Sequence, residues 1–282
     1  MPKKRKVTLG TIIIWIVLIV FSVWTIFPFF WTVITSIKIP GERFTYGFIP
    51  YVQFQPTSQN WSNILSGPEQ ERTLLGLKSS IIISAISSLL VLCLGCLSGY
   101  ALARFSFRKS KDIAVWILSN RMFPPIAVAI PFFLMMRSLR LLDTLPAIII
   151  AHTVFNLPLA IWLMRDFFKE LPKEIEEAAL IDGCSVIQTF IRVALPLALP
   201  GIIAAYILCF IFSWNEFLFV ITLSYKNVMT LPVVITGTLT VVGIDFSRIS
   251  TLTILAITPP VVLAAFTSKY LVRGLTLGAV KE

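Results

Sequence analysis

Charge is scarce in this sequence. Asp, Glu, Lys and Arg make up only 13% of its 282 residues, whereas soluble domains carry about 25%. The charges that are present lie in short clusters between long uncharged stretches, and 57% of all residues are hydrophobic. This pattern excludes a water-soluble globular domain, because each uncharged stretch can supply the roughly 20 apolar residues that a helix needs to cross a bilayer. We therefore predict an all-α membrane protein.

Side chains that carry out chemistry are also rare. The sequence contains one histidine, no Gly-x-Ser-x-Gly and no His-Glu-x-x-His, so frequent arrangements for nucleophilic and zinc catalysis are missing. It also lacks the Gly-x-x-x-x-Gly-Lys-Ser/Thr loop that binds nucleotide phosphates. We predict no catalytic residues and no cofactor in this chain, and we expect that it does not bind ATP-Mg by itself.

The four cysteines predict neither a metal site nor a disulfide framework. Cys93 and Cys96 form a C-x-x-C, but both lie in an apolar stretch with no second pair and no histidine nearby. Small buried thiols are the simpler interpretation. Cys184 and Cys209 stand alone in the sequence. We predict no metal ligands.

The N-terminal residues 3–6 are all basic, and residues 7–37 carry no charge. Short basic runs match nuclear localisation peptides by chance, and this one adjoins an apolar stretch, so it predicts a cytoplasmic flank and no nucleic-acid partner. The uncharged stretch is much longer than the apolar core of a cleaved signal peptide, and no small-residue cleavage site follows it. We predict a retained first span.

Six uncharged or nearly uncharged stretches predict six membrane spans: Thr11–Ser36, Ser79–Ala103, Ile113–Met136, Thr144–Met164, Leu197–Leu223 and Ile249–Ser268. When both termini are placed in the cytoplasm, the inner segments carry roughly twice as many Lys and Arg residues as the outer ones, as the positive-inside rule requires. We predict a cytoplasmic N-terminus, a first span, a long outer loop, a core with the other five spans, and a cytoplasmic tail, at residues 1–10, 11–36, 37–78, 79–272 and 273–282.

Two of the predicted spans contain polar residues. Arg121 precedes Pro124-Pro125 in the third span, and prolines interrupt helical hydrogen bonding, so we predict a broken or kinked helix there. Arg121 either extends to the inner interface or lines a transport pathway, and the sequence leaves both readings open. For His152 in the fourth span, a partner across the helix bundle is favoured over a proton relay.

The connection at about residues 170–200 predicts a short exposed helix. Pro172 suits a first helical position, acidic residues follow it, and Gly183 suits the left-handed conformation that ends a helix. Ser185 and Gln188 have the spacing of a capping box that begins a second helix, which we expect Pro196 and Pro200 to end. The first helix is too acidic for a helix that lies on a membrane surface.

A family resemblance rests on this same segment. Glu177, Ala178, Ala179, Asp182, Gly183, Phe190 and Pro196 are similar to the EAA loop of ABC importer permeases. The resemblance implies a type I ABC importer permease fold with six transmembrane helices, and a cytoplasmic coupling helix that docks into an ABC ATPase dimer. It further implies a second, different permease subunit, an extracytoplasmic solute-binding protein, and a place in the cytoplasmic membrane of a bacterium or archaeon.

Two further motifs resemble the maltose-type carbohydrate branch of that family. One is Trp214-Asn215-Glu216-Phe217, and the other is the C-terminal segment with Gly274, Leu275, Thr276, Gly278 and Lys281, which the resemblance directs toward the ATPase. Aromatic rings can stack on a sugar, while the amide and the carboxylate can bind its hydroxyl groups. An equally open reading makes Trp214 an interfacial anchor and pairs Glu216 with a neighbouring helix.

The resemblance implies a sugar or oligosaccharide as the cargo, with a sugar phosphate or a polyol as alternatives. A secondary transporter is the main alternative from another class, but such proteins show internal repeats with broken helices at matching positions, and we find none here. A channel would need a ring of polar pore residues, for which this sequence offers little support.

The charge distribution generates a topology prediction. Reporter domains fused at Lys109 and at Gln59 should report opposite sides of the membrane, with Lys109 in the cytoplasm. Alkaline phosphatase is active only outside the cytoplasm, so it should be active at Gln59 and inactive at Lys109. The reverse pattern would contradict the predicted orientation.

Overall fold

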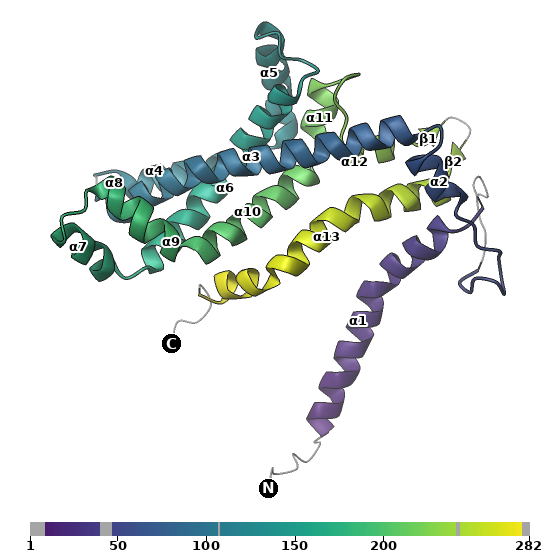
Figure 1. The fold of residues 1–282 in the computed structure, drawn as a ribbon, viewed down its shortest axis with the longest axis horizontal. Coiled ribbons are helices and arrows are strands. Elements are labelled where there is room, and N and C mark those ends of the chain that lie inside the picture. The colour runs from purple at the N-terminus through teal and green to yellow at the C-terminus, as the bar shows by residue number, and fades with distance from the viewer. Residues whose placement is uncertain (1–8, 40–46, 107, 241–242, 278–282) are drawn as a thin grey trace. The chain divides into compact units, whose positions relative to one another are not determined.

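The structure is a computed structural model that describes residues 9–39, 47–106, 108–240 and 243–277. Its contacts divide the chain into two compact units, one made of residues 1–70 and 235–255 and the other of residues 71–234 and 256–282. The described elements are helical except for a pair of two-residue strands. Figure 1 shows the helices and strands of both units.

The first unit contains the helix α1 (Leu9–Ser36), the short helix α2 (Gln59–Leu65) and the beginning of α13 (Phe246–Leu277). The strands β1 (Leu239–Thr240) and β2 (Gly243–Ile244) pair antiparallel just before α13. Asn60 of α2 is buried, and its side-chain amide donates to the carbonyl oxygens of Ser36 at 3.0 Å and Lys38 at 2.7 Å. This pair of bonds holds α2 against the end of α1.

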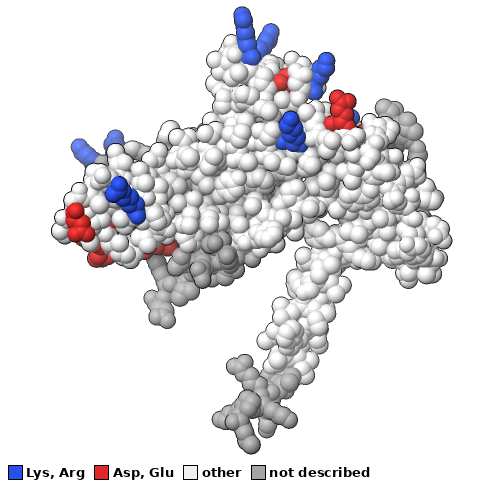
Figure 2. Space-filling model, in the orientation of Figure 1, with Lys and Arg blue, Asp and Glu red and all other residues white. Residues whose placement is uncertain are grey.

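The second unit is built around α3 (Gln70–Arg104), α6 (Leu145–Glu170) and α10 (Leu199–Trp214). Around them lie α4 (Ser110–Ser119), the 3-10 turn η1 (Asn120–Met122), α5 (Pro125–Ser138), α11 (Leu218–Leu223) and α12 (Leu231–Thr236). α3 begins at Gln70, so part of the predicted outer loop is helical. Lys, Arg, Asp and Glu gather near α5 and around α7 and α8, while the visible surface between them is largely uncharged (Figure 2).

Four helices of the described residues are long and apolar enough to cross a membrane, and six spans result if each of two bent helix pairs counts as one. The third predicted span is one such pair, bent by 92° between Ser110–Met122 and Pro125–Ser138. The predicted break at Pro124 is therefore confirmed. Phe123 and Pro124 are extended, because a proline disfavours the helical conformation of the residue before it and has no N–H to donate.

The second bent pair corrects one expectation. Pro196 does not end the helix that begins at Ser185, because α8 (Val186–Thr189) continues through a π-helical turn (Phe190–Ala194) into α9 (Leu195–Leu197). Pro196 lies in the first turn of α9, and the widened π-helical turn before it changes the bonding pattern so that its missing N–H is tolerated. The chain bends by 75° only at Ala198, ahead of Pro200.

Small residues bring α3 close to α6. A Cβ atom on Gly99 would lie only 2.7 Å from the backbone nitrogen of Arg165, and one on Gly95 would lie 3.1 Å from the Cβ atom of Ala160. α6 also packs against α10, so the three helices lie side by side (Figure 1). Helices in lipid usually associate through close backbone approach. The lipid is itself apolar, so apolar side chains gain little free energy by moving from lipid into a helix interface.

A buried carboxylate fastens the loop after α11. Asp143, between α5 and α6, accepts hydrogen bonds from the backbone N–H groups of residues 225–228, the shortest at 2.9 Å. Burial by itself raises the pKa of this carboxyl, but the bonds from Asn227, Lys226, Tyr225 and Val228 outweigh it and hold the pKa below its usual value. Four donors on one ionised acceptor make a charge-assisted clamp.

This clamp predicts a specific acid sensitivity. A carboxyl whose pKa is lower in the folded state than in the unfolded state adds to the free energy of unfolding. The contribution is complete above the unfolded pKa of an aspartate, about 3.9, and it is lost as the pH falls through the folded pKa. Asp143→Asn should lower the melting temperature of the purified protein at pH 7 and flatten its decline below about pH 4. Asp112→Asn, at an exposed position of α4, is the matched control. Equal melting curves for the two variants would contradict the clamp.

Candidate functional site

The predicted short helix is present as α7 (Lys173–Ile181). Pro172 is its N-cap rather than its first helical residue, and Glu174 and Glu176 lie in its first turn, where the positive end of the helix dipole favours acidic groups. Gly183 follows the helix with φ of +91°, which confirms the predicted left-handed conformation. A Cβ atom there would meet nothing within 4 Å, so the requirement for glycine is conformational.

The predicted capping box is also present. The backbone N–H of Gln188 donates to the hydroxyl of Ser185 at 3.3 Å, and the N–H of Ser185 donates to the side-chain carbonyl of Gln188 at 2.9 Å. These two bonds satisfy backbone donors that α8 would otherwise leave unpaired. The end of α7 and the beginning of α8 thus lie where the sequence predicts.

α7 and α8 together present a mixed acidic and apolar surface. Glu177, Ala178 and Asp182 are exposed and Ala179 is half-buried. Beside them, Ile181 exposes 87% and Ile187 exposes 71% of its surface. Large aliphatic side chains next to charged residues, outside any predicted span, are typical of a surface that another protein covers. We call Glu177, Ala178, Ile181, Asp182 and Ile187 the α7 surface.

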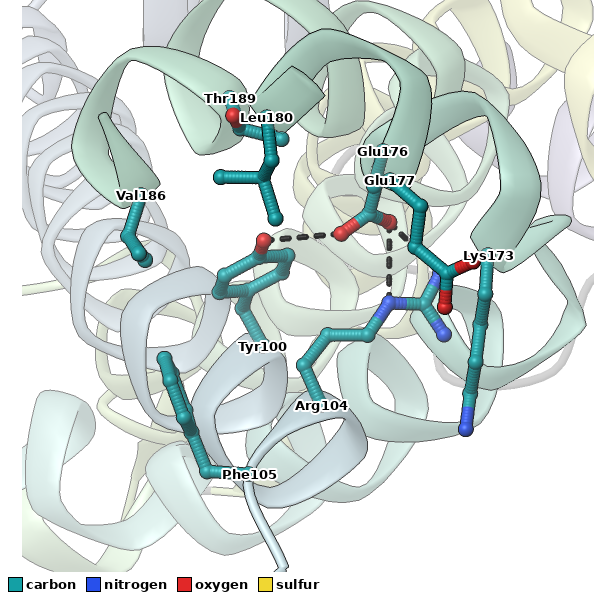
Figure 3. Close-up of a pocket in the computed structure, with 9 residues that line it drawn as sticks. All are labelled: Tyr100, Arg104, Phe105, Lys173, Glu176, Glu177, Leu180, Val186 and Thr189. Atoms are coloured by element: carbon teal, nitrogen blue, oxygen red, sulfur yellow. Dashed lines mark hydrogen bonds and ion pairs between the residues drawn. The ribbon is translucent and has the colours of Figure 1, made fainter. Parts of the chain in front are cut away.

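The inner side of α7 is held by an ion pair. Glu176 is only 6% exposed, and its carboxylate accepts bonds from Arg104 Nε at 2.9 Å, Arg104 Nη2 at 2.7 Å and the Tyr100 hydroxyl at 2.8 Å. Arg104 Nη2 also donates to the carbonyl oxygen of Leu171 at 3.0 Å. These groups line a pocket of about 250 Å³ between α7 and the end of α3 (Figure 3). In the sequence Glu176 is only one of the acidic residues that follow Pro172, because its partners lie 72 and 76 positions away.

The remaining predicted coupling residues divide between core and surface. Phe190 is buried, with its ring centroid 4.8 Å from that of Tyr100 and 6.1 Å from that of Phe168, so it supports α8 from within. Pro196 is exposed. Gly274, Leu275 and Thr276 lie in the last turns of α13, whereas Gly278 and Lys281 lie outside the described residues.

A chain of polar side chains joins four helices within the spans. The hydroxyls of Ser87 and Ser213 are 3.0 Å apart, Ser213 lies 2.6 Å from His152 Nδ1, and His152 Nε2 lies 3.1 Å from the Glu216 carboxylate. Glu216 also accepts the backbone N–H of Phe219 at 2.9 Å, at the beginning of α11. His152 therefore has the predicted partners across the bundle, and Glu216 pairs with a neighbouring helix.

The other residues of the predicted substrate segment differ in exposure. Trp214 is buried against Phe210, and its indole N–H donates to the carbonyl oxygen of Ala256 at 3.0 Å. Its ring is thus occupied by protein contacts. Asn215 is exposed and Phe217 is half-buried, and both lie where the chain leaves the helix between α10 and α11. The assignment of this segment to a substrate pathway stays a prediction.

Arg121 is half-buried at the end of η1. Its guanidinium carbon lies 4.8 Å from the ring centroid of Phe212, and Nη1 is 3.5 Å from the carbonyl oxygen of Phe155. Both contacts are to neighbouring spans, on α10 and α6. Among the residues that the structure describes, no group of three or more His, Cys, Asp or Glu side chains could hold a metal ion.

Comparisons with known proteins agree with this architecture. Residues 91–277 match the family described as the binding-protein-dependent transport system inner membrane component. The chain belongs to this family. The trehalose/maltose transport system permease protein MalG of Thermococcus litoralis is 32% identical over 98% of this chain and 99% of that protein. The sulfoquinovosyl glycerol transport system permease protein SmoH of Agrobacterium fabrum is 32% identical over 91% of this chain and 89% of that protein.

The fold is shared with a solved transporter. A chain in the crystal structure of a bacterial ABC transporter involved in the import of the acidic polysaccharide alginate superimposes with a TM-score of 0.77 and 23% identity. The superposition covers 96% of this chain and 99% of that one. The chain therefore has the helical fold of a type I ABC importer permease, and it is a transport component of the membrane.

The polar chain generates a stability prediction for this permease. His152→Ala breaks the connection between α6 and the α10–α11 segment, and loss of one partner in a buried hydrogen-bond network costs about 1–3 kcal/mol. The melting temperature of the purified permease should fall by several degrees. Asn215→Ala is the control, since that side chain is exposed and bonds only within its own helix. A melting temperature for His152→Ala equal to that of the control would contradict the structural role of the chain.

Proposed function

We propose that this permease couples ATP hydrolysis by a separate ABC ATPase dimer to the import of a sugar or oligosaccharide. The observation that supports it most is the α7 surface, which places exposed isoleucines and acidic groups on two short consecutive helices, α7 and α8, between two spans. Burying one isoleucine contributes about 1.5–3 kcal/mol, and the small side chain of Ala178 allows close approach of the covering protein. That covering protein is the ATPase, because the permease carries no phosphate-binding loop of its own.

The remaining partners follow from the same proposal. The permease pairs with a second, different permease subunit and receives cargo from an extracytoplasmic solute-binding protein. It lies in the cytoplasmic membrane of a bacterium or archaeon, with both termini and α7 in the cytoplasm, as the distribution of lysine and arginine favours. The C-terminal segment that begins at Gly274 faces the ATPase dimer.

The cargo assignment rests on the relatives and on one segment of the chain. MalG of Thermococcus litoralis is named for trehalose and maltose, and SmoH of Agrobacterium fabrum for sulfoquinovosyl glycerol. In this permease, Asn215, Glu216 and Phe217 interrupt the helix between α10 and α11, where unwound backbone and polar side chains can face a cavity. We assign this segment to the cargo pathway, with a sugar or oligosaccharide as cargo and a sugar phosphate or polyol as alternatives.

Variants of α7 test the coupling role. Gly183→Val places a β-branched residue at φ of +91°, where the strain is on the order of 1–3 kcal/mol. That strain is small against six packed spans but large against a docking contact, since about 1.4 kcal/mol changes an equilibrium tenfold. The variant should insert normally, bind the ATPase about tenfold more weakly and import poorly. Glu177→Lys should do the same by reversing a charge at the contact.

The controls for this experiment come from the same segment. Gly183→Asn keeps a residue that tolerates left-handed backbone, in a place with no steric neighbour, and should retain most of the coupling. Membrane abundance, co-purification of the ATPase and uptake of labelled trehalose or maltose are measured together. Normal ATPase association and normal uptake in both Gly183→Val and Glu177→Lys would show that α7 is not the coupling helix.

A further inference from the structure

Neither chain connection of α7 is helical. Before it, Leu171 and Pro172 are extended, with ψ of 134° and 124°, and after it Gly183 has positive φ. A helix joined to its neighbours through such residues can change its angle to them, because only a few backbone dihedrals must rotate. The backbone therefore gives α7 no rigid link to a span, and side chains must supply one.

The strongest side-chain link runs to the last turn of α3. We define the Glu176 latch as Glu176 of α7 with Arg104 and Tyr100 of α3. Arg104 donates two N–H groups to one carboxylate oxygen of Glu176, and Tyr100 donates its hydroxyl to the other (Figure 3). The side chains of Arg104 and Glu176 are 9% and 7% exposed. Such a pair depends strongly on geometry, since a buried charge that loses its partner is left without solvation.

The latch also sets which side of α7 faces outward. Successive residues on a helix point about 100° apart, so fixing Glu176 toward α3 turns Ala178 to the opposite side, while Glu177 lies at the exposed edge of the pocket (Figure 3). Tyr100 further packs against Phe168 of α6, with ring centroids 5.3 Å apart, and against Phe190. The latch is thus embedded in the packed end of the bundle and does not move as a free surface pair.

α3 can carry a displacement from the latch into the membrane. It is a continuous helix of 35 residues, and its sequence contains no proline. Ser87 of the same helix begins the polar chain to Ser213, His152 and Glu216, about 25 Å from Arg104 at a rise of 1.5 Å per residue. α3 therefore connects the α7 surface physically with the segment assigned to the cargo pathway.

We propose that Glu176, Arg104 and Tyr100 are positioning residues that transmit the movement of α7 to α3 during transport, which rests on the proposed coupling role of α7. The latch holds α7 and α3 as one rigid piece. Breaking it leaves the α7 surface able to bind the ATPase but separates ATP hydrolysis from opening of the pathway. The expected signature is uncoupling, which differs from loss of docking.

Uptake and hydrolysis are measured on the complete transporter reconstituted with its ATPase and binding protein. Glu176→Gln and Arg104→Lys should keep the affinity for the ATPase within about twofold of wild type. The number of cargo molecules imported per ATP hydrolysed should fall about tenfold, which corresponds to about 1.4 kcal/mol. Tyr100→Phe removes one hydrogen bond and should give a smaller loss. Glu174→Gln, an exposed glutamate in the first turn of the same helix, is the matched control and should behave as wild type.

A distance measurement separates positioning from a merely structural role. Spin labels at Phe105→Cys and Leu180→Cys, in a background without the four native cysteines, report the separation of α3 and α7. The distance should be narrow and equal with and without ATP when the latch is intact, and broad in Glu176→Gln. The proposal would be overturned if the distance between the labels changed with ATP while the latch is intact. It would also be overturned if Glu176→Gln imported as much cargo per ATP hydrolysed as wild type.

The two proposals fail separately. If Glu177→Lys loses ATPase association while Glu176→Gln transports normally, the coupling helix stands and the latch is wrong. If Glu177→Lys and Gly183→Val both associate and transport normally, the coupling role of α7 is wrong, and the latch proposal falls with it. If Glu176→Gln loses abundance, the Tyr100→Phe variant, which keeps the ion pair, decides the question through its imported-to-hydrolysed ratio.

Discussion

Hydrocarbon offers the peptide backbone no hydrogen-bond partner, and this constraint governs the whole permease. Every span must close its backbone bonds internally, so only helices cross the membrane, and irregular backbone is tolerated where protein or a water-filled cavity surrounds it. Extended residues at Phe123 and Pro124 separate η1 from α5, and at the break between α10 and α11 Glu216 accepts the backbone N–H of Phe219, the second residue of α11.

The same scarcity of partners explains why the few polar side chains in the spans are linked to each other. A single histidine or glutamate in a bilayer destabilises the protein unless another polar group forms a hydrogen bond with it. His152 meets this requirement by bonding Ser213 on one ring nitrogen and Glu216 on the other, and Ser87 extends the chain to α3. One network thus fixes the relative positions of four helices at the place where one of them is interrupted.

Outside the spans the constraint is different, because one side of α7 must be exposed to a partner while the helix stays attached to the bundle. Water satisfies exposed acidic groups, so Glu177 and Asp182 can remain free for a partner, while Glu176 is withdrawn into a buried pair. Two neighbouring glutamates therefore have opposite environments. The helical rotation between adjacent residues points Glu176 at Arg104 and leaves Glu177 at the exposed edge of the same pocket.

The sequence by itself determined the features that depend on local chemistry. Uncharged stretches indicated the apolar segments, although the second bent pair covers Val186–Trp214 and not the predicted Leu197–Leu223. Prolines specified the break at Pro124, and the spacing of Gly183, Ser185 and Gln188 specified the end of α7 and the beginning of α8. Family membership was also recognisable, because the EAA-like segment is contiguous. Only the tertiary structure decided that Pro196 lies within a helix, that Glu176 pairs with Arg104, and that Trp214 is enclosed by protein. These contacts join residues far apart in the chain or depend on an unusual π-helical turn, and no local pattern encodes the geometry in which packed helices meet.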